Sequence, residues 1–275
     1  LENAKKKFDY ASDVFGKNLF NICEENPQID EKDNSLNSTK NTQICLFLVE
    51  SILVDSLKAN GYNPDFVAGH SLGEITALYA AEVLSFEDSV SLIKVRSELM
   101  SNAPEGSMAA IIGFDRTELN NAIDNINNIV IANDNSSSQV VLSGSKNALE
   151  NISTIIKCKR FINLNVSGAF HSHFMDLPSK EFSSYLDLIN FDKPIYPIIS
   201  NSNPSFSKDP IQLKHRLKEQ MCNGVRWRET MDLMNKESEL HFIEIGPSNV
   251  LGGLAKRHMK SVKITQISSS KDVTY

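Results

Sequence analysis

The stretch that decides the fold is residues 66–73, which read FVAGHSLG. Its first three residues are apolar and follow Pro64, which predicts a short strand. Residues 74–83 then show the apolar spacing of a helix. A strand that passes through a sharp glycine turn into a helix is the context in which a G-x-S-x-G sequence exposes its serine. The stretch therefore predicts an α/β fold with Ser71 at the strand-to-helix turn.

Ser71 has the surroundings that a nucleophilic serine needs. Gly69 and Gly73 remove side chains where the strand and the helix approach each other. The helix N-terminus directs free N–H groups and a positive dipole toward the turn. The backbone N–H of Leu72 can then donate to an oxyanion. We therefore predict that Ser71 is a nucleophile and that Leu72 supplies one oxyanion donor.

A serine nucleophile also needs a base, and histidine is the usual one. His171 lies in a loop of small residues, SGAFHS at 167–172, and functional residues commonly lie on such loops. From the residues alone, His171 is the first candidate and His173 the second. The histidines of the chain are His70, His171, His173, His215, His241 and His258.

Away from the turn, strands and helices alternate, which favours a mostly parallel sheet covered by helices on both faces. The pattern changes at 107–168, where apolar runs and helical stretches follow in the order β-α-β-β-α-β. This order is typical of a ferredoxin-like unit. We therefore predict an α/β core formed by residues 1–106 and 169–275, with a small ferredoxin-like domain inserted at 107–168.

The composition excludes several classes of protein. The 275 residues carry a net charge of −6, so the chain lacks the basic character of a nucleic-acid binder. No apolar run approaches the roughly 20 residues of a membrane helix. The four cysteines lie far apart, and no Cys/His cluster has metal-ligand spacing. We therefore predict a cytoplasmic protein with free thiols, no metal, and no nucleic-acid or membrane partner.

Four motifs carry a resemblance to a known family. They are GHSLGE at 69–74, KVRSELM at 94–100, NVSGAFHS at 165–172 and IEIGPSNVLGGL at 243–254. Together they resemble the malonyl-CoA:acyl carrier protein transacylase family, and most closely the freestanding acyltransferases of trans-acyltransferase polyketide synthases. The resemblance extends over nearly the whole chain in collinear order. It implies an α/β-hydrolase-like core with a ferredoxin-like insertion, a monomer, and no cofactor.

The resemblance also implies roles for individual residues. Ser71 matches the family's nucleophile, and His171 matches its general base. Arg96 matches the arginine that binds the malonyl carboxylate, a task for which the guanidinium fork is suited. Gln220 matches the glutamine whose main-chain carbonyl orients the histidine. The resemblance therefore implies a serine–histidine pair with no catalytic aspartate.

Two further residues are assigned by the resemblance. Phe170 occupies the position associated with the choice of malonyl over methylmalonyl groups, and an aromatic residue there is also consistent with simple core packing. An aromatic wall would disfavour an α-methyl group by about 1–3 kcal/mol. Asn133 resembles an asparagine at the edge of the family's active site.

The sequence departs from the family pattern at its start. The family begins with a strand and a Gly-Gln-Gly motif, whose glutamine supplies the second oxyanion N–H. No such motif occurs in this chain. We expect the natural protein to carry a further segment before Leu1, with that motif in it; the alternative is a protein that lacks the segment and its oxyanion donor.

These inferences predict transfer of a malonyl group from malonyl-CoA to the phosphopantetheine thiol of an acyl carrier protein. The alternative is an acyl hydrolase that clears acyl chains from carrier proteins with the same serine and histidine. An ordinary esterase is disfavoured, because its histidine would lie near the C-terminus. A non-catalytic carrier-binding protein is the fourth hypothesis. Carrier proteins are generally acidic, so docking needs a local basic patch, for which residues 214–218 and 256–260 are the candidates.

Overall fold

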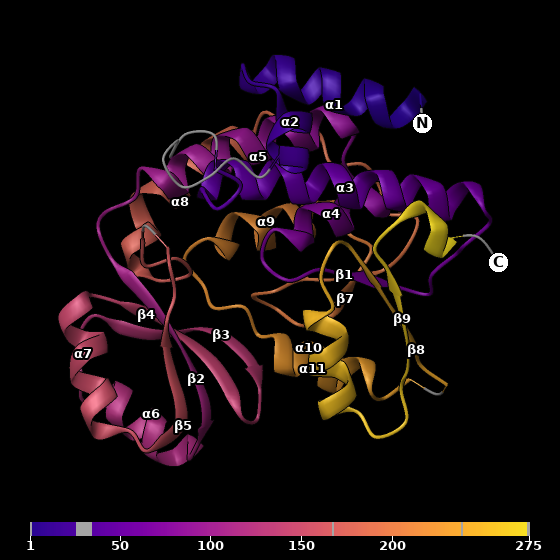
Figure 1. Ribbon diagram of the computed structural model, residues 1–275. Helices are drawn as coiled ribbons and strands as arrows, with labels where there is room; N and C mark the ends of the chain where they lie inside the picture. The colour runs from indigo at the N-terminus through magenta and orange to yellow at the C-terminus, as the bar shows by residue number, and fades with distance from the viewer. Residues whose placement is uncertain (1, 26–34, 167, 238, 274–275) are drawn as a thin grey trace.

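The computed structural model describes residues 2–25, 35–166, 168–237 and 239–273. Figure 1 shows a layer of helices at the top, a four-stranded sheet with two helices at the lower left, and a pair of strands beside two helices at the lower right. The chain is a mixed α/β protein, as its sequence predicts. Among the described residues, no helix combines the length and the apolar character needed to cross a membrane. The four cysteines are free thiols.

The helical layer is organised around α3 (Thr39–Ala59). Ser38 caps this helix by accepting a hydrogen bond from the N–H of Asn41. The side chains of Phe47 and Leu48 are fully buried in the main hydrophobic cluster, and their burial fixes α3 at the centre of the layer. The helices of the layer are α1 (Glu2–Phe15), α2 (Leu19–Glu25), α3, α4 (Gly73–Ala80), α5 (Phe86–Ser101), α8 (Asp176–Leu186) and α9 (Pro210–Gln220).

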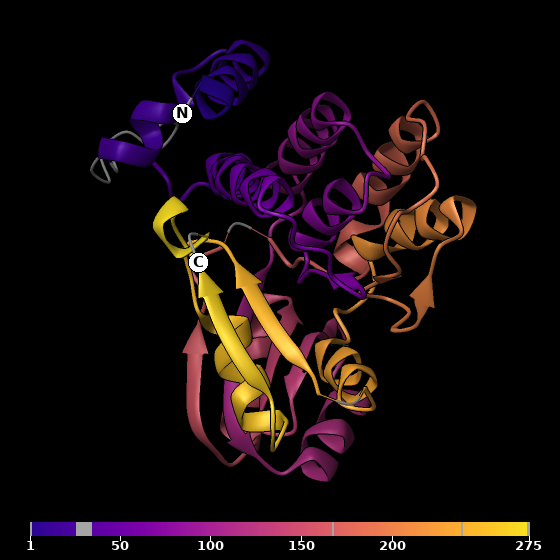
Figure 2. The same ribbon diagram turned by 90° about the vertical axis from the view of Figure 1, so that its right-hand side faces the viewer.

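The strands of the core form two short sheets, which differs from the single sheet that the sequence predicts. β1 (Val67–Ala68) pairs in parallel with β6 (Ile198–Ile199), and β6 pairs in the antiparallel direction with β7 (Phe206–Ser207). β8 (His241–Ile245) and β9 (Lys263–Ile267) form a separate parallel pair, visible side by side in Figure 2. Apolar runs indicate where strands lie, but the partner of each strand depends on residues far away in sequence. The remaining elements outside the four-stranded sheet are α10 (Trp227–Met234), α11 (Val250–His258) and the 3₁₀ turns η1 (His173–Met175) and η2 (Ser270–Val273).

The four-stranded sheet has the strand order β3-β4-β2-β5, and each neighbouring pair is antiparallel. Its two helices begin at caps encoded in the sequence, because Asp115 and Ser145 accept hydrogen bonds from N–H groups in the first turns. The sheet and these helices enclose a hydrophobic cluster of their own. The elements are β2 (Ser107–Phe114), α6 (Arg116–Asp124), β3 (Ile129–Ser136), β4 (Gln139–Gly144), α7 (Lys146–Ile155) and β5 (Cys158–Asn163).

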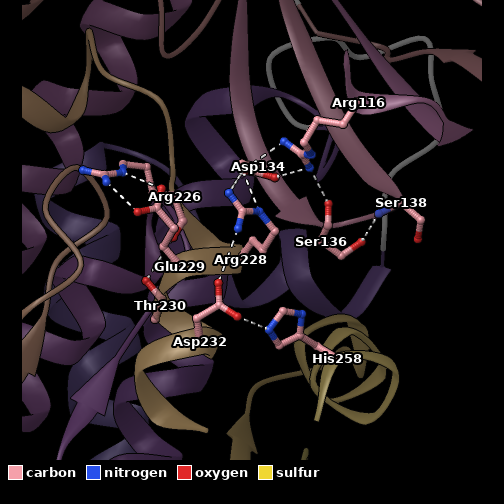
Figure 3. A network of polar contacts seen from close by, with 10 residues as sticks. All are labelled: Arg116, Asp134, Ser136, Ser138, Arg226, Arg228, Glu229, Thr230, Asp232 and His258. Carbon is pink, nitrogen blue, oxygen red and sulfur yellow. Dashed lines mark hydrogen bonds and ion pairs between the residues drawn. The ribbon is translucent and has the colours of Figure 1, made fainter. Parts of the chain in front are cut away.

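A polar network joins the four-stranded sheet to the core (Figure 3). Asp134 on β3 accepts hydrogen bonds from Arg116 on α6 at 2.8 Å and from Arg228 on α10 at 3.0 Å. The backbone N–H of Asp134 also donates to the carbonyl of Val225 at 2.9 Å. These contacts hold the edge of β3 against the segment that precedes α10. From Arg228 the network continues to Asp232 and His258.

Candidate active site

The turn between β1 and α4 presents Ser71 just before the start of the helix. Ser71 has a φ of 51°, in the left-handed region that residues other than glycine seldom adopt. Gly69 is required here, because a Cβ at this position would lie 1.9 Å from the carbonyl oxygen of Gly73. The N–H of Gly73 donates to the carbonyl of His70 at 2.9 Å and closes the turn. The turn therefore holds Ser71 in a strained conformation at a helix N-terminus.

His171 faces Ser71 from the loop before α8, and it too has a positive φ, of 56°. Its Nε2 lies 2.9 Å from Oγ of Ser71. Its Nδ1 lies 2.9 Å from the main-chain carbonyl oxygen of Gln220 and 3.2 Å from that of Asn223. Carbonyl oxygens only accept hydrogen bonds, so Nδ1 carries the proton and Nε2 is left to accept the Ser71 hydroxyl. This tautomer is the one that a general base needs.

The surroundings of His171 keep its imidazole neutral. Burial lowers the pKa of His171 to about 4, and the guanidinium of Arg96 contributes by repelling the protonated ring. The carbonyl oxygens that accept from Nδ1 act in the opposite direction but do not outweigh burial. At neutral pH the ring is therefore ready to take a proton.

We expect the reactivity of Ser71 to be nearly independent of pH between about pH 5 and pH 8. The base form of His171 is already complete in this range, because its pKa is about 4. The rate at which a fluorophosphonate probe labels Ser71 should change by less than about twofold across the range. A steady loss of rate below about pH 6.5 would show that His171 has an ordinary pKa. Circular dichroism at each pH checks that the protein stays folded.

Arg96 on α5 brings a buried positive charge to the same site. Its side chain is 1% exposed, and Nη2 lies 3.1 Å from Oγ of Ser71 and 3.0 Å from Oε1 of Gln220. Nη1 donates to Oε1 of Gln43 at 2.5 Å, and Nε has no partner among the described residues. Burial lowers the pKa of Arg96 to about 10, so the group stays protonated at neutral pH. The hydrogen-bond partners of the guanidinium are therefore neutral oxygens, while the carboxyl of Glu74 favours its charge through space.

Gln220, at the end of α9, contacts both the histidine and the arginine. Its main-chain carbonyl accepts from Nδ1 of His171, as described above. Its side-chain Nε2 donates to the carbonyl of Ser71 and to Oε2 of Glu74, each at 2.8 Å. Because Nε2 faces these two acceptors, Oε1 faces Arg96. One residue therefore orients two groups of the site.

Leu72 and Phe170 lie next to the serine and the histidine in sequence. In the described part of the chain the N–H of Leu72 has no hydrogen-bond partner, which leaves it free to donate to an oxyanion. Phe170 is buried in the main hydrophobic cluster and also packs against the backbone at Gly168. Its position is therefore compatible with both of the roles that the sequence suggests.

Among the described residues, Asn133 and His173 lie outside the hydrogen bonds that join Ser71, His171 and Arg96. Asn133 is buried on β3, where its main chain pairs with Val225. None of the hydrogen bonds between described residues links its side chain to the serine or to His171. His173 is exposed at the start of η1, and its ring packs against Phe174. The structure thus favours His171 over His173 as the base.

Three buried polar residues of the site are not predicted from the sequence: Gln43, Glu74 and Asn201. Glu74 closes the quoted GHSLGE motif, so a signal for it was present in the sequence. Gln43 is only a polar residue in an otherwise apolar helix, and Asn201 only follows the apolar strand β6. The sequence gives no indication of which distant groups these amides contact.

Comparison with known proteins places the chain in a family. The sequence profile of the acyl transferase domain family matches residues 6–273. The chain belongs to the acyl transferase domain family. Both the turn that carries Ser71 and the loop that carries His171 lie inside the matched range of this acyl transferase domain.

Several similar acyl transferases are known. A malonyl CoA-acyl carrier protein transacylase of Synechocystis sp. is 42% identical over 98% of this chain and 90% of that protein. A crystal structure of the Synechocystis sp. malonyl-CoA:ACP transacylase superposes with a TM-score of 0.93, covering 98% of this chain and 90% of that one. The polyketide biosynthesis malonyl CoA-acyl carrier protein transacylase PksC of Bacillus subtilis is 35% identical over 96% of this chain and 92% of that protein. A structure of a type II PKS acyl-carrier protein in complex with its malonyl-transacylase matches with a TM-score of 0.90 at 29% identity, covering 99% of this chain and 90% of that one.

Proposed function

We propose that this acyl transferase domain moves a malonyl group from malonyl-CoA to the phosphopantetheine thiol of an acyl carrier protein, through an ester on Ser71. The observation that carries the proposal is Arg96, a buried cation 3.1 Å from the Ser71 hydroxyl whose direct partners are neutral. A buried charge whose hydrogen-bond partners are all neutral is costly, and the carboxyl of Glu74 acts on Arg96 only through space. The free carboxylate of a malonyl ester on Ser71 would supply a directly bonded counter-charge through paired hydrogen bonds. The names of the relatives from Synechocystis sp. and Bacillus subtilis support the same substrates.

The first half-reaction loads Ser71. Nε2 of His171 takes the hydroxyl proton while Oγ attacks the carbonyl carbon of the malonyl thioester. The N–H of Leu72 donates to the oxygen that becomes negative. The carbon–sulfur bond then breaks, and the imidazolium gives its proton to the sulfur, so that CoA leaves as a thiol. The carbonyl of Gln220 stabilises the protonated ring through Nδ1.

The second half-reaction unloads Ser71. The carrier thiol gives its proton to His171, and its sulfur attacks the ester carbon. The carbon–oxygen bond breaks, Oγ of Ser71 regains a proton from the imidazolium, and the malonyl thioester of the carrier is released. Arg96 holds the malonyl carboxylate between the two steps. Because CoA leaves before the carrier reacts, the kinetics should be ping-pong.

The decisive experiment supplies the purified protein with radiolabelled malonyl-CoA, with and without a phosphopantetheinylated carrier protein. The proposal expects label on the carrier, and label on the enzyme when the carrier is absent. Release of free malonate in place of transfer would support the acyl hydrolase. Absence of label from both proteins would favour a non-catalytic carrier-binding protein.

For Phe170 we propose a role in excluding α-branched acyl groups. The residue is buried and directly precedes His171 in the sequence. Replacing it by leucine is expected to raise kcat/KM for methylmalonyl-CoA relative to malonyl-CoA by roughly tenfold, since one methyl group is worth about 1–3 kcal/mol in a pocket. A competition assay with both substrates measures this ratio directly. An unchanged ratio in a variant that melts like the wild type would leave Phe170 with a packing role only.

For docking of the acidic carrier we propose the basic patch at 256–260. The other candidate, 214–218, offers less positive surface than its sequence suggests. Arg216 is buried, which corrects its assignment as a surface residue, and Lys218 is paired with Asp187 at 2.5 Å. The overall charge of −6 repels an acidic partner, so a local patch has to provide the attraction. The exposed basic residues at 256–260 are Lys256, Arg257 and Lys260.

We propose further that residues 107–168 are a ferredoxin-like domain inserted into an α/β-hydrolase-like core of residues 1–106 and 169–275. The order β-α-β-β-α-β, the strand order β3-β4-β2-β5 and the separate hydrophobic cluster support the insertion. The passage from β1 through the Ser71 turn into α4 supports the likeness of the core. The monomeric state and the cytoplasmic location stay predictions, and analytical ultracentrifugation would test the first.

A further inference from the structure

Asn201, the second residue after β6, forms hydrogen bonds with the Ser71 turn, with Glu74 and with Arg226. Its Oδ1 accepts from the N–H of Ser71 at 2.6 Å, and its Nδ2 donates to the carbonyl of Gly69, also at 2.6 Å. Its own N–H donates to Oε2 of Glu74 at 3.2 Å, and its carbonyl accepts from the N–H of Arg226 at 3.0 Å. The residue is 2% exposed. A buried asparagine whose side chain and main chain both form hydrogen bonds is typical of a residue that fixes a geometry.

The side chain of Asn201 bridges the two peptide groups at the start of the nucleophile turn, on either side of His70. Both of its partners in the turn are main-chain groups, an N–H and a carbonyl, so the orientation of the amide is unambiguous. The bridge spans His70 and ends at the N–H of Ser71, whose φ of 51° is costly for a residue with a side chain. The amide therefore supplies tertiary contacts that hold an unfavourable local conformation in place.

The bridge also determines which N–H groups are available to an oxyanion. The N–H of Ser71 is occupied by Oδ1 of Asn201, whereas the N–H of Leu72 has no partner among the described residues. A negative oxygen formed next to Ser71 would thus be directed toward Leu72. The hydrogen bond between Oδ1 of Asn201 and the N–H of Ser71 therefore affects both the position of the attacking hydroxyl and the place where the negative oxygen is bound.

The main chain of Asn201 connects this turn to the elements that orient His171. Glu74, buried beneath the turn, accepts from the N–H of Asn201 and also from the side chain of Gln220. The carbonyl of Asn201 holds Arg226, three residues after Asn223, whose own carbonyl contacts Nδ1 of His171. Asn201 therefore connects the turn that carries Ser71 with the segment whose carbonyl groups orient His171.

We propose that Asn201 is a positioning residue for the acyl transfer, which holds Ser71 in line with His171 and directs the oxyanion to Leu72. The proposal rests on the function proposed above, in which Ser71 is acylated. In this proposal Asn201 affects how fast Ser71 attacks any acyl donor and does not affect how tightly the donor binds. Arg96, in contrast, acts on the malonyl group alone, because it binds the malonyl carboxylate.

The test compares Asn201→Ala and Asn201→Asp with the wild type. Both variants lose the hydrogen bond to Gly69, and the aspartate keeps the volume of the side chain and an acceptor for the Ser71 N–H. We expect kcat to fall by about 10²-fold in Asn201→Ala, equally with malonyl-CoA and with acetyl-CoA, while KM stays within about twofold. The rate of Ser71 labelling by a fluorophosphonate should fall in parallel in both variants. Since labelling needs no acyl donor, it tests Asn201 even if the wild type transfers no malonyl group.

Asn41→Ala is the matched control. Asn41 is a buried asparagine whose Nδ2 donates to the carbonyl of Ser35 at 2.9 Å, away from the Ser71 turn. This variant should lose stability, as measured by thermal unfolding, but keep the wild-type labelling rate. If Asn201→Ala behaves in the same way, Asn201 has a purely structural role and the proposal is overturned. If Asn201→Ala does not fold, Asn201→Asp decides, and labelling of that variant at the wild-type rate overturns the proposal.

Discussion

Replacing Ser71 by alanine is expected to lower kcat for malonyl transfer by about 10⁴- to 10⁶-fold, the range found when a serine nucleophile is removed from an enzyme that works through an acyl-serine intermediate. The loss should appear in both half-reactions, because the ester that links them can no longer form. Mass spectrometry of the protein after incubation with malonyl-CoA should find no acyl adduct. In the wild type the adduct should lie on the peptide that contains Ser71.

A second serine provides the control for this experiment. Ser145 caps α7 in the four-stranded sheet domain and lies outside the candidate active site. Its replacement by alanine should cost about 1 kcal/mol of unfolding free energy and leave malonyl transfer unchanged. Formation of the acyl adduct in Ser71→Ala would contradict the proposed nucleophile, since the malonyl group would then be carried by another residue.

Replacing Arg96 by alanine is expected to change the choice of acyl group. With malonyl-CoA, kcat/KM should fall by roughly 100-fold or more, because breaking a buried charge pair costs about 3–5 kcal/mol. With acetyl-CoA, which has no free carboxylate, kcat/KM should stay the same or rise. Arg96→Lys should restore little of the malonyl activity, since an ammonium cannot form the paired hydrogen bonds of a guanidinium. Steady-state kinetics with the two donors measures the ratio.

Arg116 supplies the matching control for Arg96. It pairs with Asp134 in the network that joins the four-stranded sheet to the core, so Arg116→Ala should keep the ratio of malonyl to acetyl activity. Free guanidinium ion added to Arg96→Ala should recover part of the malonyl activity and none of the acetyl activity. Equal losses with both donors would refute the role given to Arg96.

The sequence predicts the part of the site that is local along the chain. The glycines of 69–73 and the strand and helix around them indicate where Ser71 lies, because the turn is encoded within a few residues. His171 is harder to identify, since from the residues alone His173 is close behind it. The structure separates the two through burial and through the carbonyl groups that face the ring of His171.

The contacts that the sequence does not predict are long-range. Asn201 forms a hydrogen bond with Ser71 although 130 sequence positions separate them, and Gln220 forms one with Ser71 over a separation of 149 positions. The pairing of β1 with β6 is of the same kind, because two residues of each strand carry too little pattern to specify a partner. The basic run at 214–218 is a third example, since its charges say nothing of which face of α9 is buried.

Ser71 and His171 both have backbone conformations that an unfolded chain seldom visits, and 100 residues separate them. No short segment of the chain can therefore form the reactive pair by itself. Enzymatic activity should return only at the last stage of refolding, after the helical layer and the β1–β6 pairing are in place. The reactivity of Ser71 thus reports on completion of the tertiary structure, and a partly synthesised or misfolded chain would not consume malonyl-CoA.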